Sequence, residues 1–127
     1  MNDPLFLLDS DICIYALSGR SESLRRRLRE QPEGTVSISA VSLAEIGVGY
    51  GEAIDEAEEL QAFLQEVTVL SFDEPAARVY AQLPFKRGSF DRLIAAHALA
   101  AQRTLVTNNE ADFADIPGLR LENWTRR

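Results

Sequence analysis

Hydrophobic positions along the chain form short runs, and these alternate with longer segments in which apolar residues recur every three or four positions. The short runs predict strands, because they are apolar or β-branched and are bounded by turn residues. They lie at residues 5–8, 35–38, 67–70 and 104–106, with a last short strand at 119–121. The periodic segments predict helices at residues 12–17, 21–30, 40–50, 53–66, 74–83 and 90–102.

This alternation of strands and helices predicts the α/β class, a sandwich around a central, mostly parallel sheet of four to five strands flanked by helices. The helix at 53–66 is expected to turn Ala57, Leu60 and Leu64 inward. The helix at 90–102 is apolar on most sides, which predicts burial. In open sheets of this kind, ligands bind beyond the carboxyl ends of the strands.

Composition narrows the class of protein. With 127 residues, of which 46% are hydrophobic, the chain fits one domain with a proper core. Cys13 is the single cysteine, which excludes an internal disulfide and any site built on thiolate pairs, and we expect it to be packed. No apolar stretch approaches the length of a membrane span. The N-terminus shows no basic leader or cleavage site, so we expect a cytoplasmic protein without a membrane segment.

The net charge of −7 argues against a protein that holds nucleic acid by general electrostatic attraction. Two features weaken this argument. Every basic residue except Lys86 is an arginine, the side chain best suited to bidentate phosphate contacts. Several acids also crowd into residues 52–66, on what we interpret as one solvated helix.

Four acidic residues occupy positions from which they could meet at one edge of the sheet. Asp9 ends the first strand, Glu45 lies in the helix after the second, Asp91 opens the apolar helix and Asp112 follows the fourth strand. Carboxylates packed together repel one another, so such a cluster needs a cation to stay ionised. Hard oxygen ligands favour magnesium, with manganese as a possible substitute. Such an ion can activate water for attack on a phosphodiester.

Each acid also has a purely structural interpretation. Asp9 could be a turn residue after a strand, and Asp91 could complement the dipole of its helix. Ser42 and Glu45 have the spacing of a capping box. Asp112 could cap a short helix that begins at the next residue. No single residue decides between a site and these local roles.

Taken together, the motifs resemble PIN-domain nucleases, in particular the VapC toxins of bacterial toxin–antitoxin pairs. The resemblance covers nearly the whole chain, with the motifs in the family's order. The matching segments are Leu7–Tyr15, Ile38–Ile46, Phe90–Leu99 and Thr104–Phe113, followed by an ending at Ile116–Leu119 and Glu122–Trp124.

The resemblance implies a three-layer PIN fold, a single PIN domain over residues 1–127, and magnesium-dependent endoribonuclease activity toward RNA. It implies a cognate antitoxin that occupies the active-site groove, and commonly a toxin homodimer. The residues it implies for the site are Asp9, Glu45 and Asp91 as an acidic triad, Asp112 as a fourth acid, and Thr107 and Asn109 as polar supports near the metal.

Two positions depart from the family's pattern. Residue 109 is Asn where some relatives carry an acid, which puts a second metal ion in doubt. Residue 11 is Asp where Asn is common, which adds a carboxylate near the entrance of the site.

The remaining polar candidates stay open. Lys86, Arg87 and Arg92 flank Asp91 and could hold RNA phosphates, although a solvated loop explains them equally well. His97 falls well round its helix from Asp91, so we expect a packed or hydrogen-bonded histidine rather than a catalytic base.

Two other functions compete with the nuclease. Asp9 and Asp11 after an apolar strand also suit a haloacid-dehalogenase-like phosphatase, but its required lysine could only be Lys86, and Glu45 would be unused. A non-catalytic PIN-like module kept for partner binding is the other alternative. It has no reason to hold a repulsive cluster of acids, and it should not bind magnesium.

Overall fold

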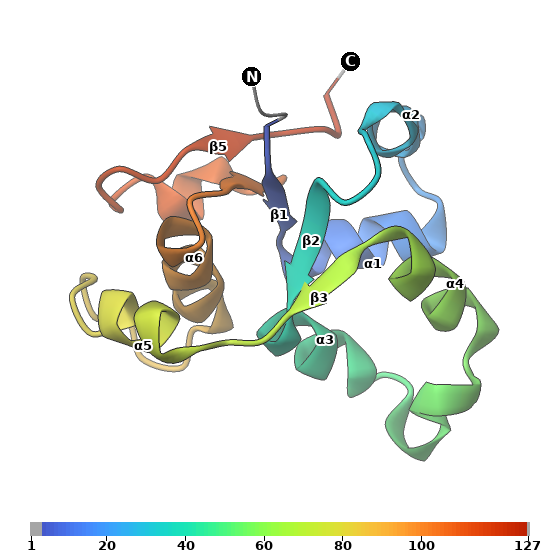
Figure 1. Ribbon diagram of the computed structural model, residues 1–127, viewed down its shortest axis with the longest axis horizontal. Helices are drawn as coiled ribbons and strands as arrows, with labels where there is room; N and C mark the ends of the chain where they lie inside the picture. The colour runs from blue at the N-terminus through green and yellow to red at the C-terminus, as the bar shows by residue number, and fades with distance from the viewer. Residues whose placement is uncertain (1–3, 127) are drawn as a thin grey trace.

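The computed structural model describes residues 4–126, which form one five-stranded sheet with helices on both sides (Figure 1). The sheet order is β3-β2-β1-β4-β5, and every neighbouring pair is parallel. The α/β prediction is therefore confirmed, and the sheet is wholly rather than mostly parallel. The strands are β1 (Phe6–Leu8), β2 (Val36–Ser39), β3 (Thr68–Leu70), β4 (Thr104–Val106) and β5 (Leu121–Glu122).

The helices form the two outer layers of the sandwich. One apolar cluster contains residues of α1 to α4, and a second contains residues of α6, on which α5 packs. Figure 1 shows these two groups on opposite sides of β1. The helices are α1 (Ser10–Ser18), α2 (Glu22–Glu30), α3 (Ala40–Gly47), α4 (Glu58–Glu66), α5 (Glu74–Tyr80) and α6 (Phe90–Ala100), with short 3₁₀ segments η1 (Gly51–Glu56) and η2 (Glu110–Phe113).

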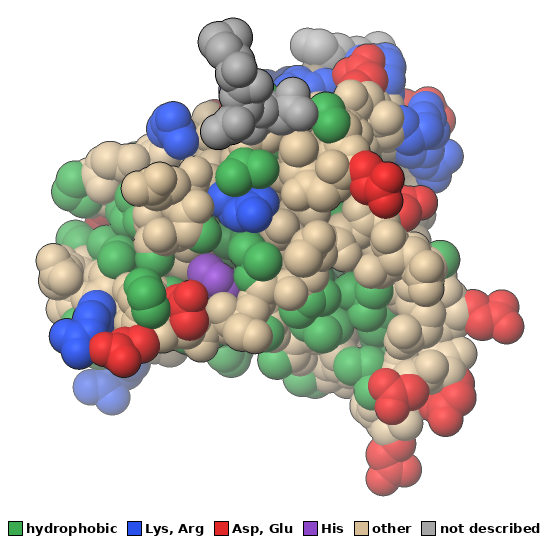
Figure 2. All heavy atoms as spheres, in the orientation of Figure 1, with side chains coloured by type: hydrophobic (Ala, Val, Ile, Leu, Met, Phe, Trp, Pro, Cys, Tyr) green, Lys and Arg blue, Asp and Glu red, His purple; other side chains and the backbone are tan. Residues whose placement is uncertain are grey.

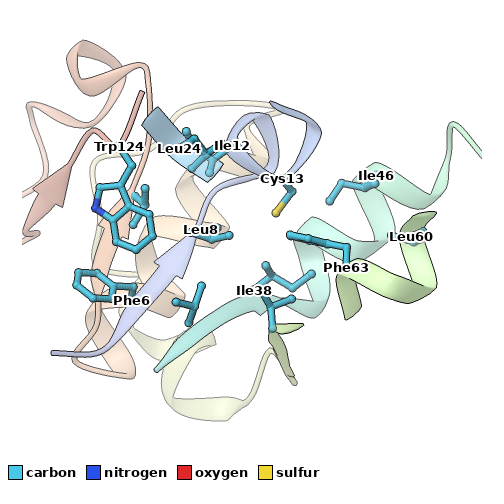
Figure 3. Packing of buried hydrophobic residues seen from close by; sticks show 13 residues of the cluster. Phe6, Leu8, Ile12, Cys13, Leu24, Ile38, Ile46, Leu60, Phe63 and Trp124 are labelled. Carbon is cyan, nitrogen blue, oxygen red and sulfur yellow. The ribbon is translucent and has the colours of Figure 1, made fainter. Parts of the chain in front are cut away.

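The central strand β1 shows why a continuous apolar run suits this position. Successive side chains of a strand point to opposite faces of the sheet. Phe6 and Leu8 enter the cluster under α1 to α4, whereas Leu7 enters the cluster under α6. Trp124, from the C-terminal segment, packs edge-on against Phe6 with 4.8 Å between ring centroids, as Figure 3 shows. β1 is therefore buried on both faces, and Asp9 directly follows its last residue, Leu8.

The prediction of one continuous helix at 53–66 is wrong. The chain forms η1 up to residue 56 and then α4, because the backbone at Ala57 is extended rather than helical. The inward positions are nonetheless confirmed, since Leu60 is buried and Ala57 and Leu64 pack against the same cluster. The apolar period continues across the break, so the sequence pattern carries no sign of it.

Other boundaries shift by a few residues. The helix predicted at 40–50 ends at Gly47, the one predicted to reach residue 83 ends at Tyr80, and the last strand starts at Leu121. No helix within residues 4–126 is long and apolar enough to cross a membrane.

The acids of residues 52–66 are exposed, as expected, although they belong to two elements instead of one helix. Figure 2 shows acidic side chains grouped at the lower right, where η1 and α4 lie in Figure 1. Part of the net negative charge therefore lies on a solvated face formed by η1 and α4.

Candidate active site

Asp9 occupies the junction between the central strand and the first helix. Its backbone N–H donates to the carbonyl oxygen of Val106 at 3.0 Å, which continues the sheet by one bond. Its Oδ1 accepts from the backbone N–H of Ile12 at 2.8 Å, so it is the N-cap of α1. The residue is 3% exposed, and the buried Thr107 side chain also hydrogen-bonds to its carboxylate. Asp9 is thus held on both sides at the carboxyl edge of the sheet.

Glu45 reaches this edge from α3. The capping-box interpretation is wrong, because α3 begins at Ala40 and its N-cap is Ser39. Instead the Ser10 hydroxyl donates to Glu45 Oε1 at 2.6 Å and lies 3.1 Å from the hydroxyl of Ser42. Ser10 had no predicted role, and Ser42 was predicted only as a possible helix cap. The signal was present, since Ser10 follows Asp9 directly and Ser42 lies one helical turn before Glu45.

Asp91 and Asp112 complete the set from the other side of β1. Asp91 lies in the first turn of α6, which the Ser89 side chain caps. Asp112 lies within η2 and caps nothing, contrary to its local interpretation. It accepts a hydrogen bond from the side-chain amide of Asn109, whose backbone N–H donates to Thr107 Oγ1. The two predicted polar supports thus contact two of the four acids.

The electrostatics show that these acids share one environment. Burial raises the pKa of Asp9 to about 6, and the charges of Asp11 and Asp91 act in the same direction, while the bonds from Thr107 and Ile12 oppose them. The pKa of Asp91 is also raised, first by partial burial and then by Asp11, Glu45 and Asp112. Asp11, the departure from the family's pattern, therefore contributes negative charge to the site.

The raised pKa of Asp9 predicts a specific pH dependence of stability. Because the folded-state pKa, about 6, lies above the ordinary 3.8, the folded state binds the proton more tightly than the unfolded state does. Asp9 therefore favours folding most in acid, and this contribution of about 3 kcal/mol at most is lost as pH rises from about 4 to about 6. Urea denaturation in chelator should show Asp9→Asn gaining stability over the parent across this range. A constant difference would contradict the shift.

The donor set fits a hard divalent cation. It consists of carboxylates, of which Asp9 is buried and Asp91 interacts electrostatically with each of the other three. Among residues 4–126, however, no three acidic, histidine or cysteine side chains already lie close enough to hold an ion together. In this arrangement the Ser10 hydroxyl holds Glu45, and the Asn109 side-chain amide holds Asp112.

The basic residues beside Asp91 separate into two kinds. Lys86 and Arg87 are exposed, and Lys86 lowers the pKa of Asp91. Arg92 is a correction to the expected RNA-binding set, because its side chain is 7% exposed and its Nη2 donates to both carboxylate oxygens of Asp115, at 2.9 and 3.0 Å. It ties α6 to the segment after η2 and presents no free guanidinium to a phosphate.

Two predictions about other side chains are confirmed, and a third side chain, Trp124, is also buried. His97 is buried, with Nδ1 2.8 Å from the Ser39 hydroxyl, and is not at the acidic site. Cys13 is packed in the core, and Trp124 is a fully buried anchor. None of the three is placed to touch a substrate at the carboxyl edge.

Comparison with known proteins identifies the family of the chain. The family model described as "PIN domain" matches residues 6–119. The chain belongs to the PIN-domain family. Within it, the chain is 32% identical to Ribonuclease VapC2 of Rickettsia felis, over 96% of this chain and 99% of the relative. It is 33% identical to the tRNA(fMet)-specific endonuclease VapC of Shigella flexneri, over 94% and 98%.

The fold agrees as well. This PIN domain superposes with a TM-score of 0.81 on a chain in the crystal structure of VapBC2 from Rickettsia felis bound to a DNA fragment from their promoter. The sequences are 31% identical, and the match covers 94% of this chain and 98% of the other. The predicted family and three-layer PIN fold are therefore confirmed as those of a VapC-type chain. A haloacid-dehalogenase-like phosphatase is excluded by the same match.

Proposed function

We propose that this VapC-type PIN domain is a metal-dependent endoribonuclease, the toxin of a toxin–antitoxin pair, and that Asp9, Glu45, Asp91 and Asp112 hold its magnesium. The observation that carries the proposal is the gathering of four acids from separate elements at the carboxyl edge of the sheet, with raised pKa values at Asp9 and Asp91. Manganese would be a chemically similar substitute. When bound, the ion would activate water and offset the charge on a phosphodiester.

The chain's own residues would prepare this site. Thr107 and the Ile12 N–H hold the Asp9 carboxylate in one orientation, while Ser10 holds Glu45. Asn109 holds Asp112 through its side-chain amide. Side chains fixed in this way lose little conformational freedom when the site closes on a ligand, which is how supporting contacts strengthen a metal centre.

The substrate class follows from the relatives and from the local charge. Both relatives are ribonucleases by name, and one is specific for tRNA(fMet). In a chain with a net charge of −7, the exposed Lys86 lies close enough to Asp91 to lower its pKa, and the exposed Arg87 follows Lys86 in the sequence; both could meet RNA phosphates. We therefore infer that RNA enters from the side of this loop.

An antitoxin is the partner we propose, since the matched Rickettsia felis structure is of VapBC2. Beside Glu45 the surface is hollowed by about 430 Å³, between α1, α3 and α4. Apolar Ile14, Leu17 and Ile46 line it, together with Glu45 and Glu59. An antitoxin segment with apolar side chains and an arginine would complement both features. The expected homodimer and the cytoplasmic location stay predictions.

The metal requirement gives the test of this function. Purified chain, free of antitoxin, should cut bulk bacterial RNA in the presence of magnesium and leave it intact in chelator. Restoring magnesium should restore cleavage. Equal cutting in chelator would contradict the proposed site. A folded chain that never cuts RNA and gains no thermal stability from magnesium would favour the partner-binding module.

A further inference from the structure

The loop between α5 and α6, together with the first residue of α6, combines two exposed aromatic rings with two exposed cations. Phe85 is 78% exposed and Phe90 is 52% exposed, and they are the aromatic members among the large apolar side chains exposed in residues 4–126. Lys86 and Arg87 lie between them in the sequence. Isolated apolar side chains on a surface need no explanation. Two exposed rings that flank a basic pair in the sequence are a less ordinary combination.

The cations of this loop are available to a ligand. Neither Lys86 nor Arg87 forms an ion pair with any acid in the described part of the chain, and both are exposed. The segment from Pro84 to Phe90 contains no acidic residue. In a chain with a net charge of −7, the loop is thus a local basic surface that favours a polyanion.

The loop also borders the acidic site. Phe90 directly precedes Asp91 at the start of α6, and Lys86 lies close enough to affect the pKa values of both Asp91 and Asp115. A strand whose phosphate is at Asp91 would therefore extend over this loop. Exposed rings beside cations are how proteins bind unpaired nucleotides, because bases stack on the rings while phosphates meet the charges.

We propose that Phe85 and Phe90 form a stacking platform for unpaired bases next to the phosphodiester that is cut, with Lys86 and Arg87 on the adjoining phosphates. The inference rests on the proposed function and adds to it the residues that contact the bases of the substrate. Bases in a duplex have no free face for a ring, so the platform selects single-stranded segments such as loops. A site that used charge alone would bind a duplex at least as well, because a duplex carries more phosphates.

The test uses an intrinsic fluorescent reporter. Trp124 is the only tryptophan of the chain and is fully buried, so a tryptophan introduced by Phe85→Trp reports on the loop. The Asp9→Asn background keeps the RNA intact, which separates binding from cleavage. The probes are 2′-O-methyl oligouridylate as a single strand, and the same strand annealed to its complement. The single strand is expected to quench the new fluorescence, and the duplex is not.

Matched variants then assign the effect to stacking. Phe85→Ala should weaken binding of the single strand about tenfold or more, as expected for loss of one stacked base. Phe85→Tyr, which keeps the ring, should bind like the parent. Val48→Ala removes an apolar side chain that is 82% exposed on another loop, and it should change nothing.

Three results would overturn the platform. The first is that Phe85→Ala binds the single strand as tightly as the parent. The second is that the duplex quenches the Phe85→Trp fluorescence as strongly as the single strand does. The third is that Phe85→Ala converts a dimer to a monomer in analytical ultracentrifugation. The last would place the rings between two copies of the chain. Failure of the platform leaves metal-dependent cleavage intact, whereas failure of the proposed function appears as full cleavage by an Asp91→Asn variant, so the two are distinguishable.

Discussion

Asp91→Asn is expected to cut RNA at least 10²–10³-fold more slowly than the parent, the scale of loss typical when a group that stabilises transition-state charge is removed. The substitution keeps the shape of the side chain but removes a negative charge from a site in which Asp11, Glu45 and Asp112 already raise the pKa of Asp91. One anionic ligand for the cation is lost. The measurement is the single-turnover rate of RNA cleavage in saturating magnesium.

The Asp91→Asn variant should still fold, so a slower cleavage rate can be attributed to the site. Asp91 is only partly buried, and the N-cap of α6 is Ser89 rather than Asp91. Removing a carboxylate from among like charges should leave the melting temperature unchanged or slightly raised. Asp55→Asn makes the same chemical change at an exposed position in η1 and should cut RNA like the parent. A folded Asp91→Asn variant with the parent's rate would remove this residue from the site.

Trp124→Ala is expected to cost about 3–5 kcal/mol of the free energy of unfolding, the usual range for removing a large buried aromatic side chain. Trp124 is fully buried against Phe6 of the central strand. The Arg27 guanidinium lies over its ring, 5.1 Å from the centroid, and its Nε1 donates to Glu122 Oε1 at 2.8 Å. The substitution thus removes contacts that join β1, α2 and the C-terminal segment.

Because domains are stable by only about 5–15 kcal/mol, this loss should remove a large share of the free energy of unfolding. Urea denaturation measures the loss. Trp124→Phe keeps the ring against Phe6 and should lose clearly less stability than the alanine variant. A loss below about 1 kcal/mol for Trp124→Ala would mean that the C-terminal segment contributes little to the fold.

The sequence predicted the elements that rest on strong local patterns. The run that includes Phe6, Leu7 and Leu8 is apolar at every position, which is what a strand buried on both faces requires, and it was placed correctly. Asp9 and Asp112 were selected as candidates for a similar reason, since they follow strands whose carboxyl ends meet at one edge. Position relative to a strand is information that the sequence carries directly.

What the sequence did not predict depends on partners far along the chain or on a single backbone angle. Arg92 was predicted as a possible RNA contact because it flanks Asp91, whereas its partner in the structure, Asp115, lies 23 residues away. The contact of Ser10 with Glu45 spans 35 residues. The break at Ala57 leaves the apolar period intact, so periodicity alone continues the helix through it.

The most direct test of the account is the initial rate of RNA cleavage by the parent and by Asp9→Asn as magnesium is raised from zero. Asn keeps an oxygen that can cap α1 at Ile12, so the variant changes the charge while retaining the local structure. The parent's rate should rise from background to saturation, while the Asp9→Asn rate stays at background. A parent rate that does not depend on magnesium, or an Asp9→Asn rate equal to it, would contradict an acidic metal site at the carboxyl edge of the sheet.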